Sequence, residues 1–270
     1  MNSNNFTEKS NVKILFDSMI EVIEIMDSFN IISFLNFGAL LGYVREKRLL
    51  PWNNDVELCA YSNDEFKKNI ISVMESLDKK GYTVLFHEYA GTLSIKKINV
   101  DINVNLVWQK KDKFIRPHDT GAKRSTSNFI SFYLYWIASY MFVFKLKSTQ
   151  NSISISDNFK YIYINVFRKI PFSIKYKIYI GLINLSKIFG AKYLSTSFPH
   201  SFFSELKTVH FNGFNVRIPV HSKDLLTYLY GDHWNIPKEN WSFYDKKNKN
   251  ETNILFIKER ILVSDWKIMS

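Results

Sequence analysis

Cysteine is almost absent from this sequence, because Cys59 is the only one among 270 residues. A disulfide framework needs paired cysteines, and a thiolate-rich zinc site needs several of them, so both are excluded. This favours a reducing compartment such as the cytoplasm. Apolar residues are plentiful by contrast, at 46% of the chain, which is enough for a sizeable buried core.

Two kinds of targeting segment are also missing. The first eleven residues, MNSNNFTEKSN, are polar and lack the basic, apolar and small-residue succession of a secretory signal. A membrane-spanning helix needs roughly twenty apolar residues, and the uncharged, aromatic-rich run from Phe129 to Phe144 has about sixteen. We therefore expect a cytoplasmic protein that can contact the inner face of the cell membrane without crossing it.

The signatures of nucleic-acid binding are absent as well, although the net charge of +11 would suit such a partner. The sequence has no arginine-rich tract, no zinc-finger spacing and no aromatic RNA-binding motif. An anionic membrane surface or a phosphorylated substrate would account for the same positive charge. We expect no nucleic-acid partner.

Histidine and serine provide no catalytic motif. The six histidines show no i, i+4 pairing of the kind that binds zinc on a helix. No serine stands in a Gly-x-Ser-x-Gly elbow, which is the usual setting of a serine nucleophile in an α/β-hydrolase. Zinc chemistry and serine hydrolysis are therefore unsupported by the sequence.

Hydrophobic periodicity predicts an α/β fold, with a mixed β-sheet core flanked by helices. Apolar residues recur at three- and four-residue steps from Val12 to Met26 and predict a helix over 11–29. Ser62 followed by Glu65 resembles a capping box that opens a second long helix over 63–79. The other predicted elements are a short helix over 39–46 and strands over 31–37, 55–61, 82–87, 92–97 and 100–107.

The middle of the chain is aromatic and basic. Between Arg168 and Lys192, lysines alternate with isoleucine, tyrosine, phenylalanine and leucine. This pattern is typical of a basic amphipathic helix that lies on an anionic membrane. It also fits a helix that packs on the core and exposes a cationic face, and we favour this second interpretation because such helices are more frequent.

Asp55 and Glu57 form the first candidate site. Side chains at i and i+2 of a strand point to the same face, so these carboxylates project together while Val56 and Leu58 point the other way. Two like charges so close repel one another and are costly to bury, so the pair is expected to need a cation. Oxygen ligands suit Mg²⁺ or Mn²⁺.

A later strand repeats this arrangement, with Asp101, Asn103 and Asn105 on one face. Asp101 is the natural third carboxylate, and three carboxylates can hold two metal ions that clamp the attacking and leaving oxygens of a phosphoryl displacement. The Gly38-Ala39 turn would let backbone N–H groups approach phosphate oxygens. Arg45 would add a positive charge whose geometry matches a diphosphate. The pattern predicts phosphoryl transfer.

Two stretches of the chain resemble the LicD and fukutin family of phosphotransferases. The first is gap-free and comprises Gly38-Ala39-Leu40-Leu41-Gly42, Arg45, Leu50-Pro51-Trp52 and Asp55-Val56-Glu57-Leu58. The second comprises Phe214 to Pro219, Leu229-Tyr230-Gly231, Trp234, Pro237 and Trp241. Together the matched regions cover roughly 31–107 and 198–243.

The resemblance implies a nucleotidyltransferase-like fold in one domain, 1–270, with its core over 11–110 and 198–245 and a helical, aromatic-rich insertion over about 120–195. It implies transfer of phosphocholine, ribitol phosphate or glycerol phosphate from a CDP-linked alcohol donor to a glycan or lipid-linked glycan acceptor, in cell-surface or capsular polysaccharide modification. CMP would leave. By matched position, the catalytic, metal-binding residues are Asp55, Glu57 and Asp101, and the substrate-binding residues are Gly38, Ala39, Arg45 and Trp52.

The chain departs from the family pattern at several positions. Asn53 and Asn54 stand where many relatives have aspartates, Ala39 where Ser or Thr is common, and Glu57 where Asp is usual. Fukutin-like members also lack acids at the two asparagine positions, and glutamate is a competent ligand, so we expect an active site. Two alternatives stay open: a nucleotidyltransferase that releases pyrophosphate, and an inactive scaffold on a membrane surface.

Overall fold

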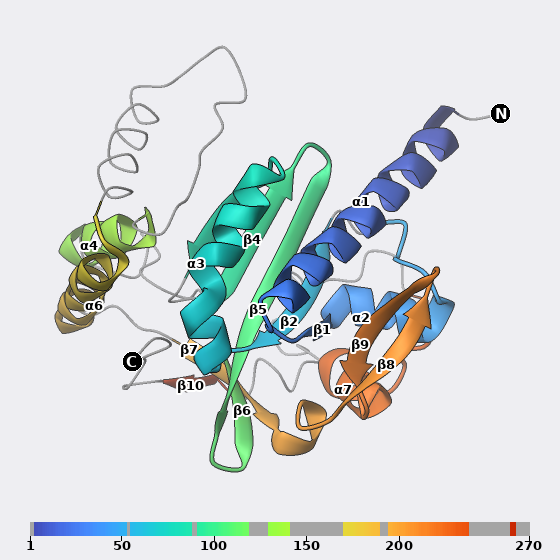
Figure 1. Ribbon diagram of the computed structural model, residues 1–270. Helices are drawn as coiled ribbons and strands as arrows, with labels where there is room; N and C mark the ends of the chain where they lie inside the picture. Colours follow the sequence, from blue (N-terminus) through green and yellow to red (C-terminus); the bar gives the residue numbers. More distant parts are fainter. Residues whose placement is uncertain are drawn as a thin grey trace.

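The computed structural model describes residues 3–52, 55–87, 91–118, 129–140, 170–189, 194–237 and 260–262. They form a mixed α/β fold in which a sheet is flanked by helices, as predicted (Figure 1). The helices are α1 (Ser3–Ser28), α2 (Phe37–Glu46), α3 (Asp64–Lys79), α4 (Phe129–Tyr140), α6 (Phe172–Ile188), η2 (His200–Phe202) and α7 (Ser222–Tyr230). The strands are β1 (Ser33–Leu35), β2 (Val56–Tyr61), β3 (Thr83–His87), β4 (Thr92–Lys97), β5 (Val100–Lys110), β6 (Lys113–His118), β7 (Leu194–Pro199), β8 (Leu206–Phe211), β9 (Phe214–Pro219) and β10 (Arg260–Leu262).

The sheet is organised around β5, which pairs with three other strands. Its first part lies parallel to β2, with Val56 opposite Ile102, and antiparallel to β4 on the other side. Its last three residues pair with β6, which leads to β7 and β10. β1 lies beside β2 and β3 beside β4, whereas β8 and β9 form a separate hairpin. Two strands that are distant in sequence, β2 and β5, are therefore neighbours in the middle of the sheet.

The main core lies against the face of the sheet that α1 and α3 cover (Figure 1). The apolar residues predicted to form one face of α1 are buried from Leu15 to Met26. Alternate residues of the central strands, such as Leu58 and Val104, are fully buried in the same core, as the two-residue period of a strand requires. The intervening polar residues of these strands are consequently left on the opposite face.

The ends of three predicted elements differ from the structure. α3 is capped by Asn63, whose Oδ1 accepts a 3.0 Å hydrogen bond from the Phe66 N–H, so the capping box predicted at Ser62 and Glu65 is wrong. α1 begins at Ser3, eight residues before the predicted start. β1 is only three residues long, because Asn36 already has the extended conformation of an N-cap and α2 follows directly.

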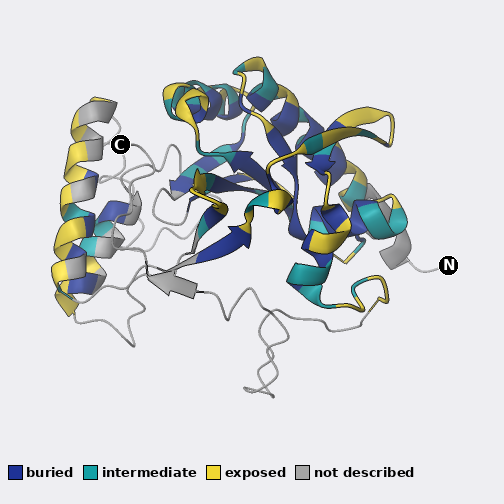
Figure 2. Cartoon of the chain, turned by 90° about the horizontal axis from the view of Figure 1, so that it is seen from below, coloured by how far each residue is buried: buried dark blue, intermediate teal, exposed yellow. Residues whose placement is uncertain are grey.

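Helices α4 and α6, which are well separated in the sequence, pack against each other beside the sheet (Figure 1), and we call this pair of helices the α4–α6 hairpin. On α6, Tyr179 and Ile183 are buried, whereas other apolar residues of the helix are exposed. Figure 2 shows exposed residues along the outer side of this hairpin, at the left of the view. The favoured interpretation, a helix that packs on the core and exposes a cationic face, is therefore incomplete, because α6 also exposes apolar side chains. Among the described residues, neither these helices nor any other is long and apolar enough to cross a membrane.

Candidate active site

The turn from β1 into α2 sets the position of the candidate site. The sequence places a tight turn at Gly38-Ala39, but the residue with a positive φ (43°) is Phe37, and Gly38 and Ala39 lie in the first turn of the helix. A left-handed φ is costly for a side chain of this size. The first N–H groups of α2 are thereby directed toward β2, and the Gly38 N–H donates to the Glu57 carboxylate.

Gly42 fixes the segment that follows α2. A Cβ atom at this position would lie 2.5 Å from the carbonyl oxygen of Arg48, which is closer than real contacts allow. Only glycine therefore lets the chain fold back across the helix. This return carries the chain through Pro51 and Trp52 toward Asp55.

Asp55 and Asp101 are brought together by the parallel pairing of β2 and β5. The register sets Val56 opposite Ile102, so Asp55 and Asp101 stand at equivalent places just before these partners. Burial raises the pKa of the Asp55 carboxyl, and the neighbouring negative charge of Asp101 raises it further. The two carboxylates are therefore close enough to repel each other, as expected for a cation site.

Glu57 lies on the same face of β2, and the pKa of its carboxyl is strongly raised. Burial raises its pKa to about 7, and the charge of Asp55 adds to this effect. The Arg116 guanidinium and the Gly38 N–H oppose it by stabilising the carboxylate form. Glu57 is thus balanced between its two protonation states near neutral pH.

The predicted polar face of β5 is confirmed, and it continues onto β4 as a ladder of paired side chains. Lys96 forms a 2.6 Å ion pair with Asp101. The Ser94 hydroxyl donates to Asn103 Oδ1 at 2.7 Å. The Thr92 hydroxyl donates to Asn105 Oδ1 at 3.2 Å. These partners hold the β5 side chains in place beside the β2 carboxylates.

The predicted metal ligands fit a divalent cation in their chemistry. All three supply oxygen atoms, which hard cations prefer, and the pKa of Asp55 is raised by Asp101, a repulsion that positive charge would relieve. In the part of the chain that the structure describes, however, no three acidic, histidine or cysteine side chains are gathered into one ligand group. Asp101 is instead neutralised by Lys96.

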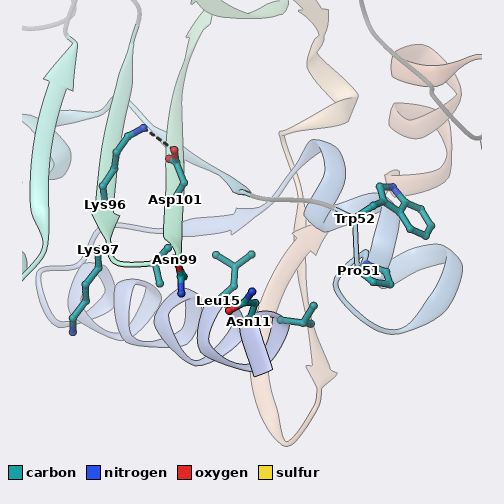
Figure 3. Close-up of a pocket in the computed structure, with 10 residues that line it drawn as sticks. Asn11, Leu15, Pro51, Trp52, Lys96, Lys97, Asn99 and Asp101 are labelled. Atoms are coloured by element: carbon teal, nitrogen blue, oxygen red, sulfur yellow. Dashed lines mark hydrogen bonds and ion pairs between the residues drawn. The ribbon is translucent and has the colours of Figure 1, made fainter. Parts of the chain in front are cut away.

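Arg45 and Trp52 lie at the edge of the same region. Two guanidinium nitrogens of Arg45 donate to Glu46, at 2.6 and 3.0 Å, and its guanidinium carbon lies 5.7 Å from the centre of the Trp52 ring. The exposed Trp52 lines a pocket of about 650 Å³ with Asp101 and Lys96. Figure 3 shows Trp52 and Asp101 on opposite sides of this pocket, with Leu15 and Asn11 of α1 below the space between them. Asn53 and Asn54 lie outside the described residues.

Arg116 on β6 is a candidate that the sequence did not reveal. Its Nη2 donates to the buried Asn105 at 2.7 Å, and its guanidinium carbon stands 4.6 Å from the centre of the Phe37 ring. Its charge lowers the pKa of Glu57. No motif surrounds this arginine, and only the pairing of the sheet brings it to the carboxylates.

Tyr230, at the end of α7, is a second residue whose place the sequence did not reveal. Burial raises the pKa of its phenol well above the usual value, and the charges of Glu57 and Asp55 add to this while Arg45 opposes it. The second stretch of family resemblance therefore meets the first at the carboxylates. Trp234 of the same stretch donates its indole N–H to Thr227 at 3.1 Å and packs on the core.

Comparison with known proteins gives one family. Residues 30–173 match the family model described as LicD/FKTN/FKRP, nucleotidyltransferase domain. No curated protein matches the sequence. Among solved structures, the solution structure of the antibiotic-resistance factor ANT(2'')-Ia is similar over 70% of this chain and 94% of its own, at 11% identity and a TM-score of 0.28. A TM-score this low carries no argument about the site.

Proposed function

Because this chain belongs to the LicD/FKTN/FKRP nucleotidyltransferase-domain family, we propose that it transfers a phospho-alcohol from a CDP-linked donor to a glycan hydroxyl. The transferred group is of the phosphocholine, ribitol phosphate or glycerol phosphate type, and the acceptor is a glycan or lipid-linked glycan of the cell surface or capsule. The proposal takes residues 1–270 as one domain with a helical insertion over about 120–195. The observation that carries it is the proximity of the Asp55 and Asp101 carboxylates, which the pairing of β2 with β5 brings together inside the segment that matches the family.

The reaction joins the acceptor oxygen to the phosphorus that bears the alcohol. The bridging P–O bond of the diphosphate breaks, and CMP leaves with the electron pair. The acceptor proton passes to a carboxylate, for which Asp101 is our candidate. Proteins of this family are typically metal-dependent, and Asp55, Glu57 and Asp101 would hold the Mg²⁺ or Mn²⁺. Such an ion, when bound, supplies positive charge to the diphosphate.

Arg116 and Arg45 provide the fixed positive charge of the site. Guanidinium groups match phosphate oxygens in geometry and stay charged at all relevant pH values. The hydrogen bond to Asn105 and the Phe37 ring hold Arg116 in one orientation beside Glu57. We assign Arg116 to a donor phosphate, with Arg45, Trp52 and the first turn of α2 (Gly38, Ala39) around the rest of the donor. This assignment rests on charge and position.

The decisive experiment measures products. The purified protein, with Mn²⁺ or Mg²⁺ and a glycan acceptor, is incubated with CDP-choline, CDP-ribitol, CDP-glycerol or CTP, and CMP and pyrophosphate are quantified. We expect CMP from one CDP-alcohol, and a loss of at least about a hundredfold in Asp55→Asn. Asp112→Asn, which changes an exposed acid at the turn between β5 and β6, is the matched control and should keep full activity.

Other products would replace the proposal by a definite alternative. Pyrophosphate from CTP would make the protein a nucleotidyltransferase that uses the same carboxylates. The absence of metal binding and of turnover with every CDP-alcohol, in a folded protein, would leave the inactive scaffold. Equal CMP release by Asp55→Asn would remove the carboxylates from the mechanism.

A further inference from the structure

The α4–α6 hairpin exposes an apolar surface that the proposed reaction does not use. On α6, Ile174, Ile178, Leu185 and Ile188 are all exposed, and their spacing of four, seven and three residues places them on one side of the helix. The exposed Gly181 lies in the middle of this row, with no atom within 4 Å of the position of an added Cβ. We call these side chains the apolar stripe.

The apolar stripe faces away from the contact between the two helices. Tyr179, Ile183 and Ser186, on the other side of α6, are almost fully buried, and α6 packs on α4. The stripe is therefore not the surface that builds the hairpin.

Helix α4 extends the exposed apolar surface. Phe129, Ile130 and Tyr133 are exposed, and the rings of Phe129 and Tyr133 lie 4.4 Å apart. Of the fourteen large apolar side chains that are exposed in the described residues, seven belong to this hairpin. Isolated exposed apolar residues are ordinary, but a concentration of this kind marks a contact surface.

The net charge of the chain is concentrated in the part of the sequence that contains the two helices. Residues 121–200 contain eleven lysines and arginines and a single acid, Asp157, whereas the rest of the chain has 25 basic and 24 acidic residues. Almost all of the net charge of +11 therefore comes from this part of the sequence. α6 itself contains three lysines and no acidic residue, and Lys177, beside the apolar stripe, is exposed.

We propose that the apolar stripe and the exposed residues of α4 dock the protein on an anionic lipid surface. Apolar side chains would enter the boundary between head groups and acyl chains while lysines contact the lipid phosphates. Lysine stems can lie along apolar surface with the charge at the head groups. The helix lies in the plane of the surface, since α6 is too short and too polar to span a bilayer.

Two other occupants fit the observations less well. A second copy of the chain would bring an equally basic hairpin to the interface, and like charges would repel. A nucleic acid would engage the lysines but would leave the apolar stripe in water. An anionic lipid surface satisfies both the apolar and the basic residues. Docking also goes beyond the transfer reaction, because it needs neither donor nor metal.

Vesicle binding of the full-length protein tests the proposal. Cosedimentation is measured with phosphatidylcholine vesicles that contain about 30% phosphatidylglycerol, and with pure phosphatidylcholine vesicles. We expect at least tenfold tighter binding to the anionic vesicles, and a tenfold loss in the double variant Ile178→Asp, Leu185→Asp. The matched control is Ile14→Asp, which changes an isoleucine of similar exposure on α1 (45% against 40% for Ile178) and should bind as the unchanged protein does.

A second measurement does not depend on aspartate variants. Cys59 is fully buried, so an environment-sensitive fluorophore attached in Ile178→Cys or Ile14→Cys reports one surface position. We expect a blue shift on anionic vesicles for Ile178→Cys only. Three results would overturn the proposal: no binding to anionic vesicles, binding that survives the double variant, or a dimer in sedimentation velocity that the double variant dissociates.

Discussion

The central sheet buries its large apolar side chains, whereas the α4–α6 hairpin exposes many of its own. In the sheet region, phenylalanines such as Phe34, Phe66 and Phe86 are at most 1% exposed, whereas Phe129 on the hairpin is 75% exposed. The charges differ too, because nearly all of the net charge of the protein is carried by the part of the sequence that contains the hairpin. Apolar content alone therefore does not show where a core lies. The apolar residues of the sheet form the buried core, whereas part of the apolar residues of the hairpin lie on its exposed surface.

Truncating one phenylalanine in each region tests most directly whether the two regions differ in packing. Phe66→Ala should lower the free energy of unfolding by about 4 kcal/mol, because it opens a cavity in a packed core. Phe129→Ala should change it by less than about 0.5 kcal/mol, since its ring is exposed. Urea unfolding followed by circular dichroism measures both. Equal losses would show that the hairpin is packed as tightly as the sheet, and the contrast would fail.

The next largest effect concerns Glu57, which the sheet holds with a raised pKa. The carboxyl has a pKa of about 7 in the folded protein against an ordinary value of 4.5, so the folded state binds the proton more tightly than the unfolded state does. The contribution of this carboxyl to the free energy of unfolding is therefore greatest below pH 4.5 and is lost as the pH rises from 4.5 through 7, by about 3 kcal/mol in total. Glu57→Gln should remove this fall.

The measurement is urea unfolding between pH 4.5 and 8, with and without the substitution. Glu75→Gln, on the exposed side of α3, is the control and should follow the unchanged protein at every pH. If the stability difference between Glu57→Gln and the unchanged protein is constant with pH, the sheet does not impose the raised pKa.

The smallest effect compares two asparagines. Asn63→Ala removes the side chain that caps α3 and should cost about 1 kcal/mol. Asn184→Ala, at an exposed position of α6, should change stability by less than about 0.5 kcal/mol, because only helix propensity is altered. Thermal unfolding of the two variants measures the difference. A larger loss for Asn184→Ala would mean that its side chain has a structural partner on the hairpin.

Features that follow from local periodicity could be predicted from the sequence. The two-residue period of the strands placed Asp101, Asn103 and Asn105 on one face, and the structure confirms it. The residue that caps α3 was misplaced by one position, because Ser62 and Asn63 both suit an N-cap. The positive φ at Phe37 was unforeseen, since glycine is the usual residue in that conformation.

Features that depend on tertiary packing could not be predicted from the sequence. Arg116 meets Glu57 only because β5 and β6 pair, and Tyr230 meets the carboxylates because α7 packs on α2. Nothing near either residue in the sequence marks such a meeting. For α6, a basic and apolar pattern is compatible with either side of the helix facing the protein, so periodicity could not show which stripe is buried.

The pairing of β2 with β5 also has a consequence for how the protein folds. Asp55 and Asp101 are separated by 46 positions, and the whole α3, β3 and β4 segment lies between them. Closing so long a loop costs chain entropy before any contact repays it, and contacts of high sequence separation slow folding. The carboxylates are therefore expected to meet late, after the β3–β4 hairpin has formed. A nascent chain that ends before β5 would carry Asp55 and Glu57 but would lack Asp101, so under the proposed function we expect activity only after β5 has joined the sheet.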